Sequence, residues 1–312
     1  MPREAGRHPQ TYRTALTITV VAALVAAVFG AMPIALLIAA FAIPIVYITY
    51  LYDVNLWEDE PIAVTALAFV LTAALAAVFT VLWTGWMPLQ PVLPGADTGI
   101  MQTPSWLGFV IFAVLVPIVG EIVRQIGPVV LASRPQFDDL MDGVTFGVIS
   151  GVAYACADTL VRHWDLLTGG LVAPQPAQLG SLIFLEGFVK PLVMGSATGL
   201  AVAEFSGLGK GYDGFSGRYV GGVLMAVVAN VLFNGGVYLL GFVAPSSLSL
   251  VLQVVWGLVV LGVLILRLRT VLQAGLLEAA LEAASRSDEG GGTTEVGFCP
   301  RCEMPLLPSA AF

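Results

Sequence analysis

Apolar residues along the chain gather into eight long stretches, which are separated by short segments of glycine, proline and charged residues. A helix needs about 20 mostly apolar residues to cross the hydrocarbon layer of a bilayer, and each stretch is close to that length. The predicted membrane-spanning helices cover residues 15–31, 33–52, 61–84, 105–132, 139–163, 181–205, 217–241 and 246–268. The pattern predicts an all-α fold: a polytopic membrane helix bundle of about eight transmembrane helices, with a short cytosolic tail.

Composition excludes a water-soluble globular protein. Of the 312 residues, 58% are hydrophobic and only 11% are charged, and the mean hydropathy is +0.91, unlike soluble domains. The expected surrounding is the lipid bilayer. The net charge of −8 comes from acidic residues, which contribute little to membrane topology, and nothing in the charge pattern indicates nucleic acid binding.

Basic residues set the predicted orientation, because lysine and arginine resist translocation. With eight crossings and an internal N-terminus, the outside receives only Arg162, while Arg124 and Lys190 lie within spans. The inside receives the remaining basic residues: Arg3, Arg7, Arg13, Arg134, Lys210, Arg218, Arg267, Arg269, Arg286 and Arg301. Both termini are therefore expected in the cytosol, and the excess of arginine over lysine favours a prokaryotic plasma membrane.

Three units are predicted along the chain. Residues 1–14 form a cytosolic N-terminal segment, residues 15–268 form the membrane domain, and residues 269–312 form a cytosolic tail. Within the tail, "AGLLEAALEAASRS" is typical of a surface helix and "DEGGGTTEVG" of a flexible linker.

The tail carries a C-P-R-C motif formed by Cys299 and Cys302. In a reducing compartment such a pair more often binds zinc than forms a disulfide, so zinc is the expected cofactor there. A zinc ribbon needs a second pair of ligands. Either the natural chain continues past Phe312, or two tails share one ion, or the half-site is idle; a short mobile tail without metal is the other interpretation.

Polar residues inside the predicted spans are the candidates for a functional site, because buried charges in a bilayer face the bundle and have partners. In "VPIVGEIVRQIGP", Glu121 and Arg124 are three residues apart and share one helix face. They form either a structural salt bridge or part of a functional site.

The fifth span carries a stripe of small residues, Gly143, Gly147 and Gly151, which lets neighbouring helices approach closely. Asp158 continues the same face and is expected to point into the bundle. It either pairs with Arg162, four residues on, or faces a polar cavity.

Spans six and seven also hold inward polar groups. Glu186 and Lys190 are four residues apart and are expected to neutralise each other, next to a proline that favours a kink. In span seven, Asn230 and Asn234 are one turn apart. Membrane asparagines often only join helices through hydrogen bonds, which is the alternative to a role in a site.

The order of these segments is similar to that of a known family. "IPIVYITYLYDVNLWEDEP", "GEIVRQ", "FDDLMDGVTFGVISGVAYACADT", "PLVMGSATG" and "NVLFNGG" succeed one another between residues 43 and 240. Together they resemble the PrsW-type intramembrane metalloproteases, a branch of the clan of CAAX-prenyl and bacteriocin-processing proteases. The glycine-rich helix is the most specific match, and the other segments match by their order.

The resemblance implies catalytic or metal-binding roles for six positions of this chain. These positions are Glu121, Arg124, Asp158, Met194, Asn230 and Asn234. Four of these positions, and the neighbouring Gly120, depart from the family pattern. Gly120 replaces a glutamate, Arg124 a lysine and Asp158 another glutamate, and Met194 and Asn230 stand where the family has histidines. The only histidines, His8 and His163, match no motif position.

Chemistry at these positions favours loss of peptidase activity. Catalytic zinc usually has three His, Asp, Glu or Cys ligands and an open position for water, whereas Met194 offers a soft thioether and Asn230 a neutral oxygen. The first hypothesis is a non-hydrolytic relative that binds membrane-protein helices or partners through a cavity between spans four and seven.

Two alternatives stay open. An active intramembrane metallopeptidase would use Glu121 as general base, with Asp158 and Asn230 around a metal ion. An ion or solute transporter would instead line its path with Glu121, Arg124, Asp158 and Lys190.

Overall fold

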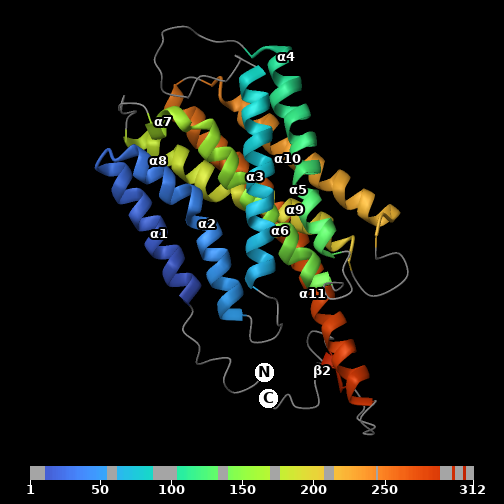
Figure 1. The fold of residues 1–312 in the computed structure, drawn as a ribbon. Coiled ribbons are helices and arrows are strands. Elements are labelled where there is room, and N and C mark those ends of the chain that lie inside the picture. The colour runs from blue at the N-terminus through green and yellow to red at the C-terminus, as the bar shows by residue number, and fades with distance from the viewer. Residues whose placement is uncertain are drawn as a thin grey trace.

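The computed structural model describes residues 11–54, 62–86, 104–132, 140–168, 176–206, 214–243, 245–288, 297–298 and 305–306 (Figure 1). Helices account for nearly all of these residues. In chain order they are α1 (Thr11–Val28), α2 (Met32–Val54), α3 (Ile62–Trp86), α4 (Trp106–Phe109), η1 (Val110–Leu115), α5 (Val116–Ala132), α6 (Leu140–Arg162), α7 (Trp164–Thr168), α8 (Pro176–Phe184), η2 (Leu185–Val189), α9 (Lys190–Ala203), α10 (Gly217–Leu240) and α11 (Ser246–Asp288). The elements η1 and η2 are single wide turns of π-helix.

The helices confirm the predicted all-α membrane bundle. Within the described residues, seven helices are long and apolar enough to cross a membrane, and they coincide with seven of the predicted spans. The remaining predicted span, 33–52, lies in α2, whose described apolar part runs over Pro33–Tyr47 and is shorter. Spans four and six are each built from an α-helix, a π-turn and a second α-helix.

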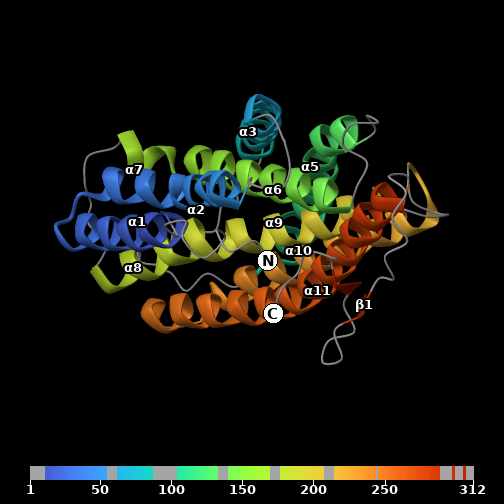
Figure 2. The ribbon, with the colours of Figure 1, turned by 90° about the horizontal axis from the view of Figure 1, so that it is seen from below.

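Helices α6 and α9 form the centre of the bundle, and they lie side by side in both ribbon views (Figures 1 and 2). In their most apolar stretches, 78% of the α6 residues and 89% of the α8–α9 residues are buried, against 11% in α1. Figure 2 shows α3 almost end-on while α6 and α9 lie across the view, so α3 crosses them steeply. Polar side chains on α6 and α9 are thereby kept from lipid.

Close contact between α6 and α9 results from the predicted glycine stripe. A Cβ atom added to Gly147 would lie 2.7 Å from Gly199 Cα, and one added to Gly151 would lie 2.5 Å from the carbonyl oxygen of Met194. Only glycine fits these backbone-to-backbone contacts.

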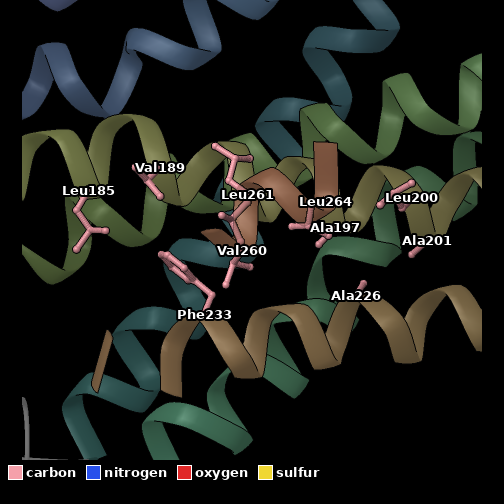
Figure 3. Packing of buried hydrophobic residues seen from close by; sticks show 11 residues of the cluster. Leu185, Val189, Ala197, Leu200, Ala201, Ala226, Phe233, Val260, Leu261 and Leu264 are labelled. Atoms are coloured by element: carbon pink, nitrogen blue, oxygen red, sulfur yellow. The ribbon is translucent and has the colours of Figure 1, made fainter. Parts of the chain in front are cut away.

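The largest apolar cluster joins α9 to α10 and α11 (Figure 3). Its members come from η2 and α9, from α10 and from α11: Leu185, Val189, Val193, Ala197, Leu200, Ala201, Ala226, Phe233, Val260, Leu261 and Leu264. Figure 3 shows the Phe233 ring extending from α10 toward the side of the cluster where Leu185 and Val189 lie. This cluster holds α10 against the central pair and so places its asparagines beside α5.

The eighth span and the predicted surface helix form one continuous helix, α11, of 43 residues. The expected boundary at residue 268 falls inside it, because the sequence from there to Asp288 holds no proline and one glycine among strong helix formers. Beyond α11, two short antiparallel strands, β1 (Gly297–Phe298) and β2 (Pro305–Leu306), pair with each other. Cys299 and Cys302 lie outside the described residues, as do residues 289–296 of the predicted linker, whose first residue ends α11 and whose last residue begins β1.

Candidate functional site

Glu121 and Arg124 form a salt bridge inside the bundle. The Arg124 Nη2 atom lies 2.6 Å from Glu121 Oε2, and Arg124 Nε donates to the same oxygen at 3.2 Å. Both side chains are almost completely buried, at 1% and 0% exposed. The spacing of three residues on α5 puts the two groups on one face, as the sequence predicted.

Three further residues complete the hydrogen bonding of the Glu121 carboxylate. Asn230 Nδ2 of α10 donates to Oε2 at 3.0 Å, and Thr198 Oγ1 of α9 donates to it at 3.3 Å. Gln125 Nε2 donates to Oε1 at 2.6 Å. Tyr219 of α10 in turn donates its hydroxyl to Gln125 Oε1 at 3.2 Å. The carboxylate therefore joins α5, α9 and α10.

Tyr154 of α6 covers the other side of the Arg124 guanidinium. The guanidinium carbon lies 4.7 Å from the ring centroid, a distance at which cation and ring attract each other. The Tyr154 hydroxyl also occupies the space next to Gly120, where an added Cβ would lie 2.7 Å from it. A side chain at position 120 would therefore require the tyrosine hydroxyl to move.

Asp158 belongs to a second polar cluster, which begins one turn beyond Tyr154 on α6. Thr80 Oγ1 of α3 donates to Asp158 Oδ1 at 2.9 Å, and Lys190 Nζ of α9 lies 2.7 Å from Oδ2. Arg162, the partner in one of the two interpretations of the sequence, is more distant at 3.6 Å. Lys190 also lies 2.6 Å from Glu186 Oε2, so its ammonium bridges two carboxylates.

The six predicted positions divide between these surroundings. Glu121, Arg124 and Asn230 are in direct contact, and Asn234 Nδ2 donates to the backbone oxygen of Asn230 at 2.8 Å. Met194 is buried in an apolar cluster with Ala76, Tyr154, Ala155 and Ala157. Asp158 has its own partners, and in the described residues it shares none of them with Glu121.

Sequence patterns did not indicate the neutral polar residues of the site. Gln125 lies four residues after Glu121 on the same helix face, so this contact could have been predicted from the spacing within the helix. Thr198, Tyr219 and Thr80 come from other helices, and no spacing within one helix reveals such partners.

The donor set around Glu121 does not fit a catalytic zinc ion. Zinc needs several His, Cys, Asp or Glu ligands, and in the described residues no three such side chains lie together in a way that could hold a metal. The side-chain oxygen of Asn230 is the one acceptor beside Glu121 without a hydrogen-bond partner in the described chain. The positive charge beside the carboxylate is instead the guanidinium of Arg124.

Comparison with known proteins gives one match. A family model described as PrsW family intramembrane metalloprotease matches residues 60–260, the stretch that runs from the start of α3 into α11 and contains both polar clusters. No curated protein and no solved structure matches the chain.

Proposed function

Because the chain belongs to the PrsW family of intramembrane metalloproteases, we propose that it is a member that no longer hydrolyses peptide bonds and instead binds the transmembrane helices of other membrane proteins. The family supports a membrane domain that is suited to partners within the bilayer. This chain departs from the family in the side chains at the motif positions.

One observation carries the loss of hydrolysis: both oxygens of the Glu121 carboxylate accept hydrogen bonds from protein donors, and Oε2 accepts from three side chains. Arg124, Thr198 and Asn230 donate to one oxygen and Gln125 to the other. A general base must be free to accept a proton from water, and a metal ion would have to displace a guanidinium that lies 2.6 Å away. This arrangement supports a structural role for Glu121.

The surroundings of two other motif positions support the same proposal. Asp158 is paired with Lys190 at 2.7 Å, so its charge is already compensated. Met194 packs among alanines and Tyr154, where its thioether acts as an apolar group. Neither side chain is placed to coordinate a metal ion together with Glu121.

We expect the full chain with Cys299→Ser and Cys302→Ser, which removes the tail thiolates, to purify from lipid without stoichiometric zinc. Elemental analysis of the protein measures this directly. The same preparation should leave co-reconstituted single-span proteins intact by mass spectrometry. Cleavage within the bilayer that Glu121→Ala abolishes would establish an active peptidase instead. Zinc at one ion per chain that the same substitution removes would contradict a purely structural role of Glu121.

Partner binding is proposed at the outer side of α5 and α10. The predicted cavity lay between these spans, but the structure joins them through Glu121 and Asn230. On either side of that contact the two helices present apolar side chains outward, at Ile122, Ile126, Leu224 and Val228. An apolar helix packed there would lie across the contact between α5 and α10. The buried hydrogen bond from Asn230 to Glu121 keeps the shape of that surface constant.

Energy transfer between a labelled single-span peptide and the labelled protein in liposomes tests this surface. Leu224→Trp should weaken peptide binding about tenfold or more, corresponding to about 1.4 kcal/mol. Val21→Trp on the outer face of α1, where Val21 is similarly exposed, is the matched control and should leave binding unchanged. Equal effects of the two variants would contradict the proposed surface.

We also propose that the protein resides in a prokaryotic plasma membrane with both termini in the cytosol, which the distribution of basic residues supports. Zinc binding by Cys299 and Cys302 is proposed on their spacing alone.

A further inference from the structure

A second buried ion cluster lies at the C-terminal end of α6, and neither the family match nor the proposed function uses it as a whole. Its anions are Asp158 and Glu186, and its cations are Arg162 and Lys190. Thr159 Oγ1 donates to Glu186 at 2.9 Å and accepts from Lys190 Nζ at 3.1 Å. With two charges of each sign, the cluster is electrically balanced.

His163 adjoins this balanced cluster without being part of its hydrogen bonding. The imidazole is 7% exposed, and neither ring nitrogen has a hydrogen-bond partner within the described residues. Its Nε2 atom lies 3.9 Å from Glu186 Oε2, too far for a hydrogen bond. Burying a polar group without a hydrogen-bond partner costs free energy, so a partner for the imidazole would stabilise this arrangement.

We propose that His163 is a proton-binding switch: a proton taken up from solvent by its imidazole draws Glu186 away from Lys190 into a direct ion pair with His163. Lys190 keeps a carboxylate partner throughout, because Asp158 Oδ2 lies 2.7 Å from its Nζ. The cluster then carries one net positive charge in place of none. Histidine is the side chain whose ordinary titration falls between pH 5 and 8.

Glu186 lies in η2, a π-turn that can change conformation when Glu186 moves. The residue after this turn, Lys190, donates its backbone N–H to the oxygen of Leu185. Such wide turns are uncommon and recur at functional sites in helices. Gly187 in the same turn packs against Ala39 of α2 so closely that an added Cβ would lie 2.6 Å from the Ala39 Cβ. A displacement of Glu186 would therefore reach the contact between η2 and α2.

The other elements around His163 add few ionisable groups. Asp165 of α7 is exposed, α3 contributes Thr80 to Asp158 and Trp83 beneath the Arg162 guanidinium, and α8 carries no ionisable side chain. The first ionisable residue of α2, Tyr47, bonds to the oxygen of Thr145, about 27 Å along α6 from His163. Glu186 is thus the carboxylate positioned to receive the protonated imidazole.

The two chain neighbours of His163 reach the surface of the bundle. Arg162 next to it has a side chain that is 27% exposed, and Trp164 on its other side is 61% exposed. In the proposed orientation this end of α6 faces the outside. The switch would then respond to the pH outside the cell.

Nuclear magnetic resonance of the full chain in lipid nanodiscs tests the switch directly, because the sequence holds only two histidines. With His8→Ala, the single imidazole signal belongs to His163 and should shift between pH 5 and 8. Adding Glu186→Gln should move that transition to lower pH by about one unit or more, since the partner charge is lost. Glu204→Gln, which removes the acid of the distant exposed pair with Arg218, is the matched control and should move nothing.

Hydrogen exchange gives the second readout. Amides of residues 185–189 should lose protection several-fold as His163 takes up its proton, and His163→Gln should remove this pH dependence. A His163 signal that stays constant from pH 5 to 8, or an equal response to Glu186→Gln and Glu204→Gln, overturns the proposal. If Glu186→Gln does not fold, the comparison with His163→Gln decides, and equal pH dependence of the original chain and of His163→Gln overturns it.

Discussion

Replacing Arg124 with alanine is expected to lower the free energy of unfolding by about 3–5 kcal/mol, because it leaves the charge of Glu121 buried without its cation. The loss has two physical parts. The carboxylate loses two N–H donors at 2.6 and 3.2 Å, and Tyr154 loses the guanidinium stacked on its ring. Reversible unfolding in mixed micelles, or steric trapping in lipid, measures the change.

A double substitution separates charge from packing. Arg124→Met with Glu121→Gln removes both charges and keeps similar volumes, so it should recover most of the lost stability, as neutral replacements of buried ion pairs often do. Arg218→Ala is the matched single control, since its pair with Glu204 has side chains 52% and 32% exposed and should contribute less than about 1 kcal/mol. If Arg124→Ala costs no more than Arg218→Ala, the buried pair does not hold α5 in place.

The second large effect is expected at the contact between α6 and α9. Gly151→Ala should lower the free energy of unfolding by about 3 kcal/mol, the upper part of the range for overpacked cores. The reason is steric: the new methyl group would meet backbone atoms of Met194 and Gly195 at 2.5–2.6 Å, and neither backbone can move without separating the helices. Gly151→Leu is expected to prevent folding.

Gly221→Ala provides the control for this prediction. Gly221 also lies in a spanning helix, α10, but an added Cβ there would meet no atom within 4 Å. Its substitution should change stability by no more than about 0.5 kcal/mol. Similar effects at both glycines would mean that the close approach of α6 and α9 does not set the requirement for glycine at position 151.

Much of the fold can be predicted from patterns within single helices. The length of the apolar stretches predicted the spans, and the spacing of Gly143, Gly147 and Gly151 predicted the face of α6 that packs closely on a neighbour. The spacing of Glu121 and Arg124 likewise predicted that their side chains share one face. These features depend only on the helical repeat, which the sequence displays directly.

Contacts between helices could not be predicted from such patterns. Spacing paired Asp158 with Arg162, yet Lys190 of α9 lies nearer to it, at 2.7 Å against 3.6 Å. The glycine contacts bring α9 so close to α6 that Lys190 of α9 lies nearer to the Asp158 carboxylate than Arg162 of α6 does. The contact between Glu121 and Asn230 depends in the same way on the apolar cluster that holds α10.

The length of α11 has a mechanical consequence for the terminal segment of the chain. Its apolar stretch, Ser247–Leu277, is long enough to cross the hydrocarbon layer, and the helix continues from there to Asp288, on the order of 16 Å further. A helix is stiff over that distance. Because β2 contacts α11, the helix also provides the surface on which the described part of the terminal segment packs.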